Sequence, residues 1–141
     1  MKRRIVIADD DPTIINLVSL RLGLARYDVL SASNGTDALD LIRKTEPVAV
    51  ILDVRMPGGG GMAALDALRA DPVTSNLPVM MLTGERNPGA VMSAMDSGAS
   101  DYMVKPFHLD RLLERVTRMV KSSAMNWSRP VAANDGPVWE L

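Results

Sequence analysis

Four stretches of the sequence carry side chains that could do chemistry together. Asp9 and Asp10 follow one short apolar run, and Asp53 follows another. Thr83 and Lys105 end two further runs later in the chain. Ligands of open α/β sheets sit outside the carboxyl ends of the strands, so residues at strand ends gather at one edge. We therefore expect these carboxylates, the hydroxyl and the ammonium to share one pocket.

Carboxylates that are brought together need a positive counter-charge. Two unit charges about 4 Å apart repel by roughly 4 kcal/mol at an effective dielectric constant near 20. Oxygen ligands without histidine or cysteine favour Mg²⁺, which binds one or two carboxylates and keeps several waters. Lys105 adds a positive charge suited to a phosphate oxygen. Flanked by a metal ion and a lysine, Asp53 is a credible nucleophile toward phosphorus and would form an aspartyl-phosphate.

The elements that must position these residues are short apolar runs separated by amphipathic stretches. The apolar runs cover residues 5–8, 27–32, 48–52, 79–82 and 102–104. Continuous apolar runs of this length are typical of parallel strands covered on both faces. Apolar residues at helical spacing follow each run, most clearly over 109–120. Five strands alternating with five helices predict a doubly wound α/β parallel sheet.

Several residues mark the predicted helix ends. Asp11 is expected to be the N-cap of the first helix rather than a metal ligand, with Pro12 at the first helical position. The third helix is expected to stop near Pro72, and Gly98 to follow the fourth as its C′ residue. His108 lies at the start of the last helix, where capping or exposure is favoured over a phosphorelay role.

Composition narrows the class of protein. The chain has 141 residues and no cysteine, so disulfides are excluded. Its formal net charge of −1 argues against a protein that coats nucleic acid or an anionic membrane. The apolar run after the first four residues is too short for a signal peptide, so a cytoplasmic protein is expected. Residues 1–121 are predicted to form one domain. Residues 122–141, with Trp127 and Trp139, lack periodicity and are interpreted as a tail or linker.

In this order the motifs resemble those of the receiver domains of two-component response regulators, of the chemotaxis-regulator type. The matching segments are residues 8–12, 52–57, 82–84 and 98–107, within a resemblance that runs from about Arg3 to Lys121. The resemblance implies a flavodoxin-like (βα)₅ sheet with strand order 2-1-3-4-5. The sequence departs from the family at Gly58 to Gly61, where Met-Asp-Gly is common and only Gly61 matches. The glycines remove a helix-capping acid beside the proposed site.

The resemblance also implies a role for each residue of the acidic site. Asp53 is similar to the phosphoacceptor. Asp53 and Asp10 are also similar to Mg²⁺ ligands, with Asp10 binding the ion directly. Asp9 resembles a partner ligand that often acts through water, and the backbone carbonyl of Arg55 would be a third protein ligand.

The implied switch uses three further residues. Thr83 would hydrogen-bond the phosphoryl group and Lys105 would pair with it, while Tyr102 resembles the aromatic side chain that turns inward when the threonine moves. The Lys105–Pro106 peptide is similar to one that is cis in the family.

The implied partners are a sensor histidine kinase or phosphotransfer protein and an output domain or partner protein. The output would dock on the surface of the fourth helix, fifth strand and fifth helix, which is also a face for a homodimer. Such a domain catalyses its own Mg²⁺-dependent phosphorylation and dephosphorylation and is not a turnover enzyme. Direct binding to nucleic acid or membrane is not expected.

Other functions fit the residues less well. A phosphatase of the haloacid dehalogenase type needs a second acid two residues after its nucleophile, and Arg55 stands there. The glycine run lacks the Lys-Ser/Thr of a P-loop. A pseudo-receiver that never takes phosphate is disfavoured because the acids, threonine and lysine are all present. Arg55 and Glu85 are either two exposed charges or, by hypothesis, a pair that closes over the phosphoryl group and slows attack by water.

Overall fold

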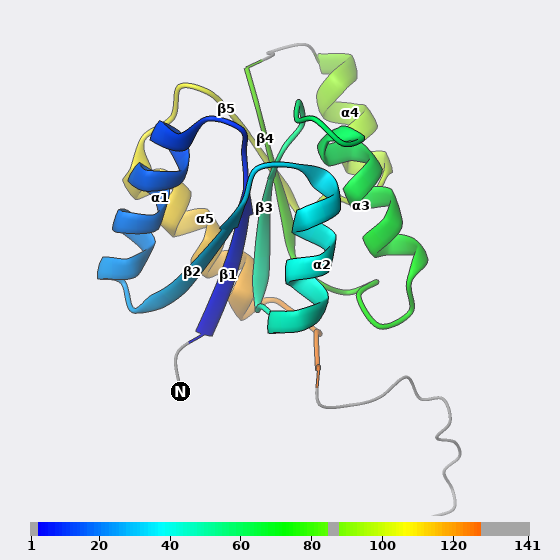
Figure 1. Ribbon diagram of the computed structural model, residues 1–141, viewed down its shortest axis with the longest axis horizontal. Helices are drawn as coiled ribbons and strands as arrows, with labels where there is room; N and C mark the ends of the chain where they lie inside the picture. The colour runs from blue at the N-terminus through cyan, green and yellow to red at the C-terminus, as the bar shows by residue number, and fades with distance from the viewer. Residues whose placement is uncertain (1–2, 85–87, 128–141) are drawn as a thin grey trace, which may run out of the picture.

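The computed structural model describes residues 3–84 and 88–127, and along them five strands alternate with five helices (Figure 1). The elements follow in the order β1 (Arg3–Ala8), α1 (Pro12–Leu24), β2 (Tyr27–Ala32), α2 (Gly35–Thr45), β3 (Ala49–Asp53), α3 (Gly60–Ala70), β4 (Val79–Thr83), α4 (Pro88–Asp96), β5 (Asp101–Val104) and α5 (Leu109–Lys121). In this part of the chain no helix is both long and apolar enough to cross a membrane.

The five strands form one parallel sheet in the order β2-β1-β3-β4-β5, as predicted. Helices α1 and α5 cover one face, and α2, α3 and α4 cover the other (Figure 1). Alternate residues of each strand point to opposite faces. Ile5 and Ile7 therefore join one core cluster while Val6 and Ala8 join the other. This burial on both faces explains the continuous apolar runs and confirms the predicted fold class.

The predicted helix ends are also confirmed. The Asp11 side chain accepts a hydrogen bond from the Thr13 amide at 2.9 Å and caps α1, which starts at Pro12. After α4, Gly98 has a φ of +100° and donates to the Met95 carbonyl, while Ala99 donates to that of Ala94. These two hydrogen bonds are the Schellman arrangement, which turns the chain into β5.

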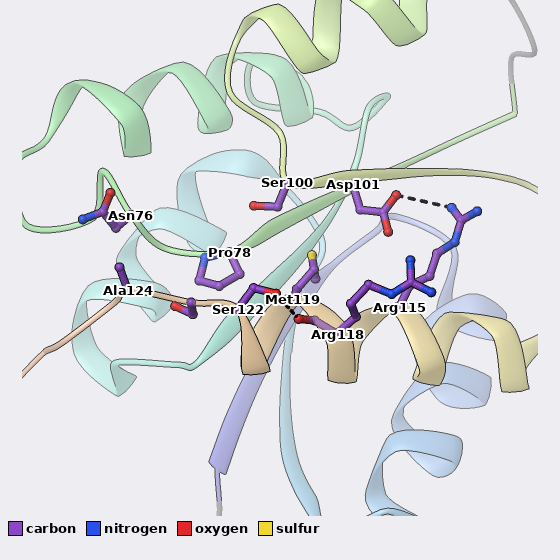
Figure 2. Close-up of a pocket in the computed structure, with 10 residues that line it drawn as sticks. Asn76, Pro78, Ser100, Asp101, Arg115, Arg118, Met119, Ser122 and Ala124 are labelled. Carbon is purple, nitrogen blue, oxygen red and sulfur yellow. Dashed lines mark hydrogen bonds and ion pairs between the residues drawn. The ribbon is translucent and has the colours of Figure 1, made fainter.

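Two arginines tie the amino-terminal end of β5 and the turn before it to helices on the two faces of the sheet. Arg69 of α3 donates to the Gly98 carbonyl at 2.9 Å and holds the turn that precedes β5. Arg115 of α5 donates to the Tyr102 carbonyl at 3.0 Å. Arg115 also contacts the Asp101 carboxylate at 3.3 Å (Figure 2). The strand that delivers Lys105 to the sheet edge is thus held from both sides.

The loop between β3 and α3 depends on its glycines. Gly58, Gly59 and Gly60 all have positive φ, at 74°, 94° and 74°, which other residues adopt only with strain. Gly59 caps α3 without a side-chain hydrogen bond, which confirms the predicted loss of a capping acid. Gly61 has a different constraint, because a Cβ there would collide with the Asp53 carbonyl oxygen and approach Met81 Cε to 3.0 Å.

We predict that Gly61→Ala lowers the free energy of unfolding by about 1–3 kcal/mol, because the colliding atom is backbone and cannot rotate away. Gly23→Ala is the matched control. A Cβ at Gly23 meets nothing within 4 Å, so alanine in this helix should stabilise by about 0.5–1 kcal/mol. Urea unfolding followed by circular dichroism measures both. Equal stabilities for the two variants would contradict the close approach of α3 to Asp53.

Candidate functional site

The residues singled out in the sequence meet at the carboxyl edge of the sheet, the upper edge in Figure 1. Asp53 and Thr83 are the last residues of β3 and β4, and Asp9 and Lys105 come directly after β1 and β5. These are four consecutive strands of the sheet, so the chain topology alone places their ends side by side.

Three carboxyl groups converge at this edge. Asp9, Asp10 and Asp53 each offer an oxygen atom, and these atoms all lie within 4.8 Å of one another. Asp9 is fully buried and Asp53 is 5% exposed, whereas Asp10 faces solvent. Buried carboxylates are rare unless they are paired or bind a metal, so this arrangement marks a functional site.

Lys105 supplies the positive charge of the site. Its Nζ lies 2.9 Å from Asp9 Oδ2 and 3.4 Å from Asp53 Oδ2. The backbone orients the carboxylates further: Asp9 Oδ1 accepts the Asp11 amide at 2.9 Å, and Asp53 Oδ1 accepts the Arg55 amide at 3.3 Å. The second oxygen of Asp53 is therefore turned toward the lysine.

The titration behaviour reflects this crowding. Burial, followed by the charge of Asp9, raises the pKa of Asp53 from 3.8 to about 6, although Lys105 partly opposes the shift. Burial lowers the pKa of Lys105, but its hydrogen bond to Asp9 and the charges of Asp53 and Asp9 outweigh burial, and the net change is upward. The raised pKa of Asp53 thus reflects its burial first and the charge of Asp9 second.

The remaining predicted residues lie on strands β4 and β5 or directly after β5. Thr83 is 1% exposed, and its carbonyl accepts the Lys105 amide at 2.7 Å. Tyr102 is 9% exposed and belongs to the core cluster on the face covered by α2, α3 and α4. The Lys105–Pro106 peptide is cis, as the resemblance implied. Glu85 lies outside the described residues.

The donor set fits a hard divalent cation. Its side-chain ligands would be carboxylate oxygens, which Mg²⁺ prefers. Asp9 Oδ2 is a buried oxygen whose charge is compensated by the Lys105 ammonium, 2.9 Å away. A carboxylate has about four lone-pair sites on its two oxygens, so Asp9 could bind a metal ion as well as Lys105. The participation of the Arg55 carbonyl stays a prediction.

One feature of the site was not anticipated from the sequence. The shortest contact of Lys105 is to Asp9, which had been assigned to the metal alone. The acidic run does not reveal which of its members points inward. The period of two along β1 could have indicated it, because a residue two positions after the buried Ile7 is expected on the same face of the strand, and that residue is Asp9.

Comparison with known proteins agrees with this geometry. The family model described as the response regulator receiver domain matches residues 5–117. The DNA-binding dual master transcriptional regulator RpaA of Synechocystis is 38% identical over 118 residues, which are 84% of this chain and 49% of that protein. The DNA-binding response regulator MtrA of Mycolicibacterium smegmatis is 35% identical over 116 residues, 82% of this chain and 50% of that protein. The chain thus spans about half the length of these curated relatives.

Solved structures show the same fold. The chemotaxis response regulator CheY4 of Vibrio cholerae superimposes with a TM-score of 0.79 at 31% identity, over 84% of this chain and 99% of that one. The receiver domain of the Francisella response regulator 1452 superimposes with a TM-score of 0.80 at 29% identity, over 86% of this chain and 98% of that one.

We predict that Asp53→Asn stabilises the metal-free protein above the native pKa of about 6, by on the order of 1 kcal/mol after solvent screening. The native pKa lies above the ordinary value of 3.8, so the native state binds a proton more tightly than the unfolded chain does. Stability therefore falls as the pH rises through both values. The asparagine variant lacks this loss, so the difference should vanish at acidic pH.

The measurement is urea unfolding in a chelator across this pH range. Asp66→Asn, which removes an exposed carboxylate of α3, is the control and should show no comparable trend. A destabilised Asp53→Asn protein at neutral pH would contradict the raised pKa of Asp53.

Proposed function

We propose that this chain, which belongs to the family of response regulator receiver domains of two-component signalling, takes a phosphoryl group onto Asp53. The donor would be a sensor histidine kinase or a phosphotransfer protein. The observation that carries the proposal is the position of Lys105 Nζ, 3.4 Å from Asp53 Oδ2, beside two further carboxyl groups. That arrangement presents a carboxylate oxygen next to a cation that can pair with an incoming phosphoryl oxygen.

The transfer would be a direct displacement at phosphorus. An Asp53 carboxylate oxygen forms the new P–O bond, and the bond to the donor nitrogen breaks, with the electron pair staying on the nitrogen. The Arg55 amide holds Asp53 Oδ1 at 3.3 Å, which fixes the carboxylate plane during attack. Lys105 stays within reach of the phosphoryl oxygens, so the product keeps a positive neighbour.

Asp9, Asp10 and Asp53 would hold a Mg²⁺ ion, with the Arg55 carbonyl as a further ligand. When bound, the ion offsets the repulsion among the carboxylates and the charge that a phosphoryl group adds. Asp9 would hold the Lys105 ammonium in position through their ion pair. Asp10 is exposed, so the site would be open to solvent and to a donor.

The switch would begin at Thr83. New bonds from Thr83 and Lys105 to the phosphoryl group contribute roughly 1.5–3 kcal/mol each when charge-assisted. Two such bonds approach the roughly 5.5 kcal/mol that inverts a 1:99 population. Tyr102 lies in the core cluster with Ala94 and Ala99, so a shift of Thr83 next to this cluster would change its packing.

The face of α4, β5 and α5 would carry the response to an output domain, to a partner protein or to a second copy of the chain. Exposed apolar side chains on α4 support this use, with Met92 65% and Met95 45% exposed. The chain would act by docking rather than by binding nucleic acid itself, in keeping with its net charge of −1. It would be a signalling domain and not a turnover enzyme.

Arg55 remains a candidate for setting the lifetime of the phosphoryl group. It lies two residues after Asp53, and its amide contacts the Asp53 carboxylate. By hypothesis its side chain and that of Glu85 close over the modified aspartate and exclude water. Unchanged phosphoryl lifetimes in Arg55→Ala and Glu85→Ala would refute this.

We predict that incubation with acetyl phosphate and Mg²⁺ adds one phosphoryl group to the protein and that Asp53→Asn abolishes the addition. Intact-protein mass spectrometry measures the modification. Hydroxylamine should remove it, because it cleaves an acyl phosphate and leaves a phosphoserine intact. Asp66→Asn should be modified like the wild type. Continuous release of phosphate without a stoichiometric adduct would indicate a phosphatase, and a modified Asp53→Asn protein would place the reaction elsewhere.

We also predict that Mg²⁺ raises the melting temperature and that Asp10→Asn removes most of the rise. A ligand that binds only the native state stabilises it by about 2.7 kcal/mol at a hundredfold excess over its Kd. Asp10 is the suitable ligand to change because its side chain is exposed. An equal rise in Asp10→Asn and Asp66→Asn would mean that the ion binds outside the acidic cluster.

A further inference from the structure

The chain after α5 folds back onto the domain. Residues 122–127, here called the strap, leave the helix after Ser122 and Ser123 donate to carbonyls of its last turn. The Ser123 hydroxyl oxygen then accepts the Met125 amide at 2.9 Å and turns the chain. At the end of the strap, the Trp127 indole Nε1 donates to the Pro47 carbonyl at 2.7 Å, across 80 positions of sequence.

The strap runs along the amino edge of the sheet. Figure 2 shows Ser122 and Ala124 passing Pro78, just before β4, and Trp127 reaches the connection between α2 and β3. One side of the strap borders a pocket of about 380 Å³ in which Pro78, Ser122 and Ala124 take part. This edge is opposite the carboxyl edge that holds Asp53, as Figure 1 shows.

Apolar contacts accompany the hydrogen bond. Met125 and Trp127 pack against the core cluster under α2, α3 and α4, whereas Val48 and Val120 pack against the cluster on the other face. Val48, Val120, Ser123, Met125 and Trp127 together line a small cavity of about 120 Å³. Pro47 is buried in this arrangement. The strap therefore contacts, at the amino edge of the sheet, residues that pack against both core clusters.

We propose that Pro47, Val48 and Val120 form a docking groove for an indole and that its occupant is Trp127 of the same chain. A tryptophan suits this groove because its ring packs on apolar side chains while its N–H reaches a carbonyl. Burial of the ring and this hydrogen bond offset the conformational entropy that residues 122–127 lose on ordering. The folded unit thus extends from the predicted end at Lys121 to Trp127.

The docking places Trp127 at the α2–β3 connection, on the edge of the sheet away from Asp53. The inference does not depend on the proposed function, since it involves none of the residues of the acidic site.

Fluorescence quenching of the full chain tests the proposal. The chain has two tryptophans, so Trp139→Phe leaves Trp127 as the only indole fluorophore. In this variant the acrylamide quenching constant should be several-fold lower than in the same protein unfolded in urea. A native value equal to the unfolded value would overturn the docking.

Changes to the groove and the strap complete the test in the Trp139→Phe background. Val48→Asp places a charge in the groove and should raise quenching toward the unfolded value, with circular dichroism reporting whether the domain remains folded. Ser123→Ala removes the turn acceptor without changing the groove and should raise quenching in part. Met92→Asp, an exposed apolar residue of α4, is the matched control and should change nothing.

Measurements at different protein concentrations distinguish docking of Trp127 within one chain from docking of Trp127 from a second copy. Protection that is constant on dilution, with a monomer in size-exclusion chromatography, supports docking within one chain. Protection that is lost on dilution together with a dimer would show that the strap of a second copy fills the groove, and would overturn the proposal. Unchanged quenching in both Val48→Asp and Ser123→Ala would place Trp127 elsewhere on the protein.

Discussion

The structure depends on an imbalance of charge at the carboxyl edge of the sheet. Three carboxyl groups face one ammonium, and Lys105 is closer to Asp9 than to Asp53. The Lys105 ammonium therefore compensates the charge of the fully buried Asp9 more closely than that of Asp53. Burial and the charge of Asp9 raise the pKa of Asp53 to about 6. A site in which buried carboxyl groups lie this close together would be stabilised by an added cation.

The apolar core is what keeps these charges together. All residues of β3 and β4 are buried, so the strands that deliver Asp53 and Thr83 cannot move apart without exposing both faces of the sheet. The approach of α3 through Gly61 adds a backbone contact directly behind Asp53. The hydrophobic effect thus opposes a local repulsion of a few kcal/mol and holds the carboxyl groups close together in spite of it.

The sequence predicted the fold and the site wherever local pattern and topology were sufficient. The caps at Asp11 and Gly98 follow from residue type, and the meeting of Asp53 with the acidic run follows from strand ends and chain direction, whereas the strand order was implied by the family resemblance. The contact between Lys105 and Asp9 was missed because the register of side chains within an acidic turn leaves no mark in composition. The contact of Trp127 with Pro47 was missed because it joins residues 80 positions apart without any periodic pattern.

Helix α5 connects the two edges of the sheet. Through Arg115 it holds the Tyr102 carbonyl of β5, and through Val120 it contributes to the groove that receives Trp127. A ligand shifts a conformational equilibrium only through contacts that differ between the two states. A phosphoryl group that altered the packing of Tyr102 would act on α5 at the Arg115 contact, and a rigid helix would transmit that displacement to its last turn. The docked strap would then move with α5, so the position of residues 122–127 at the opposite edge would depend on the state of Asp53.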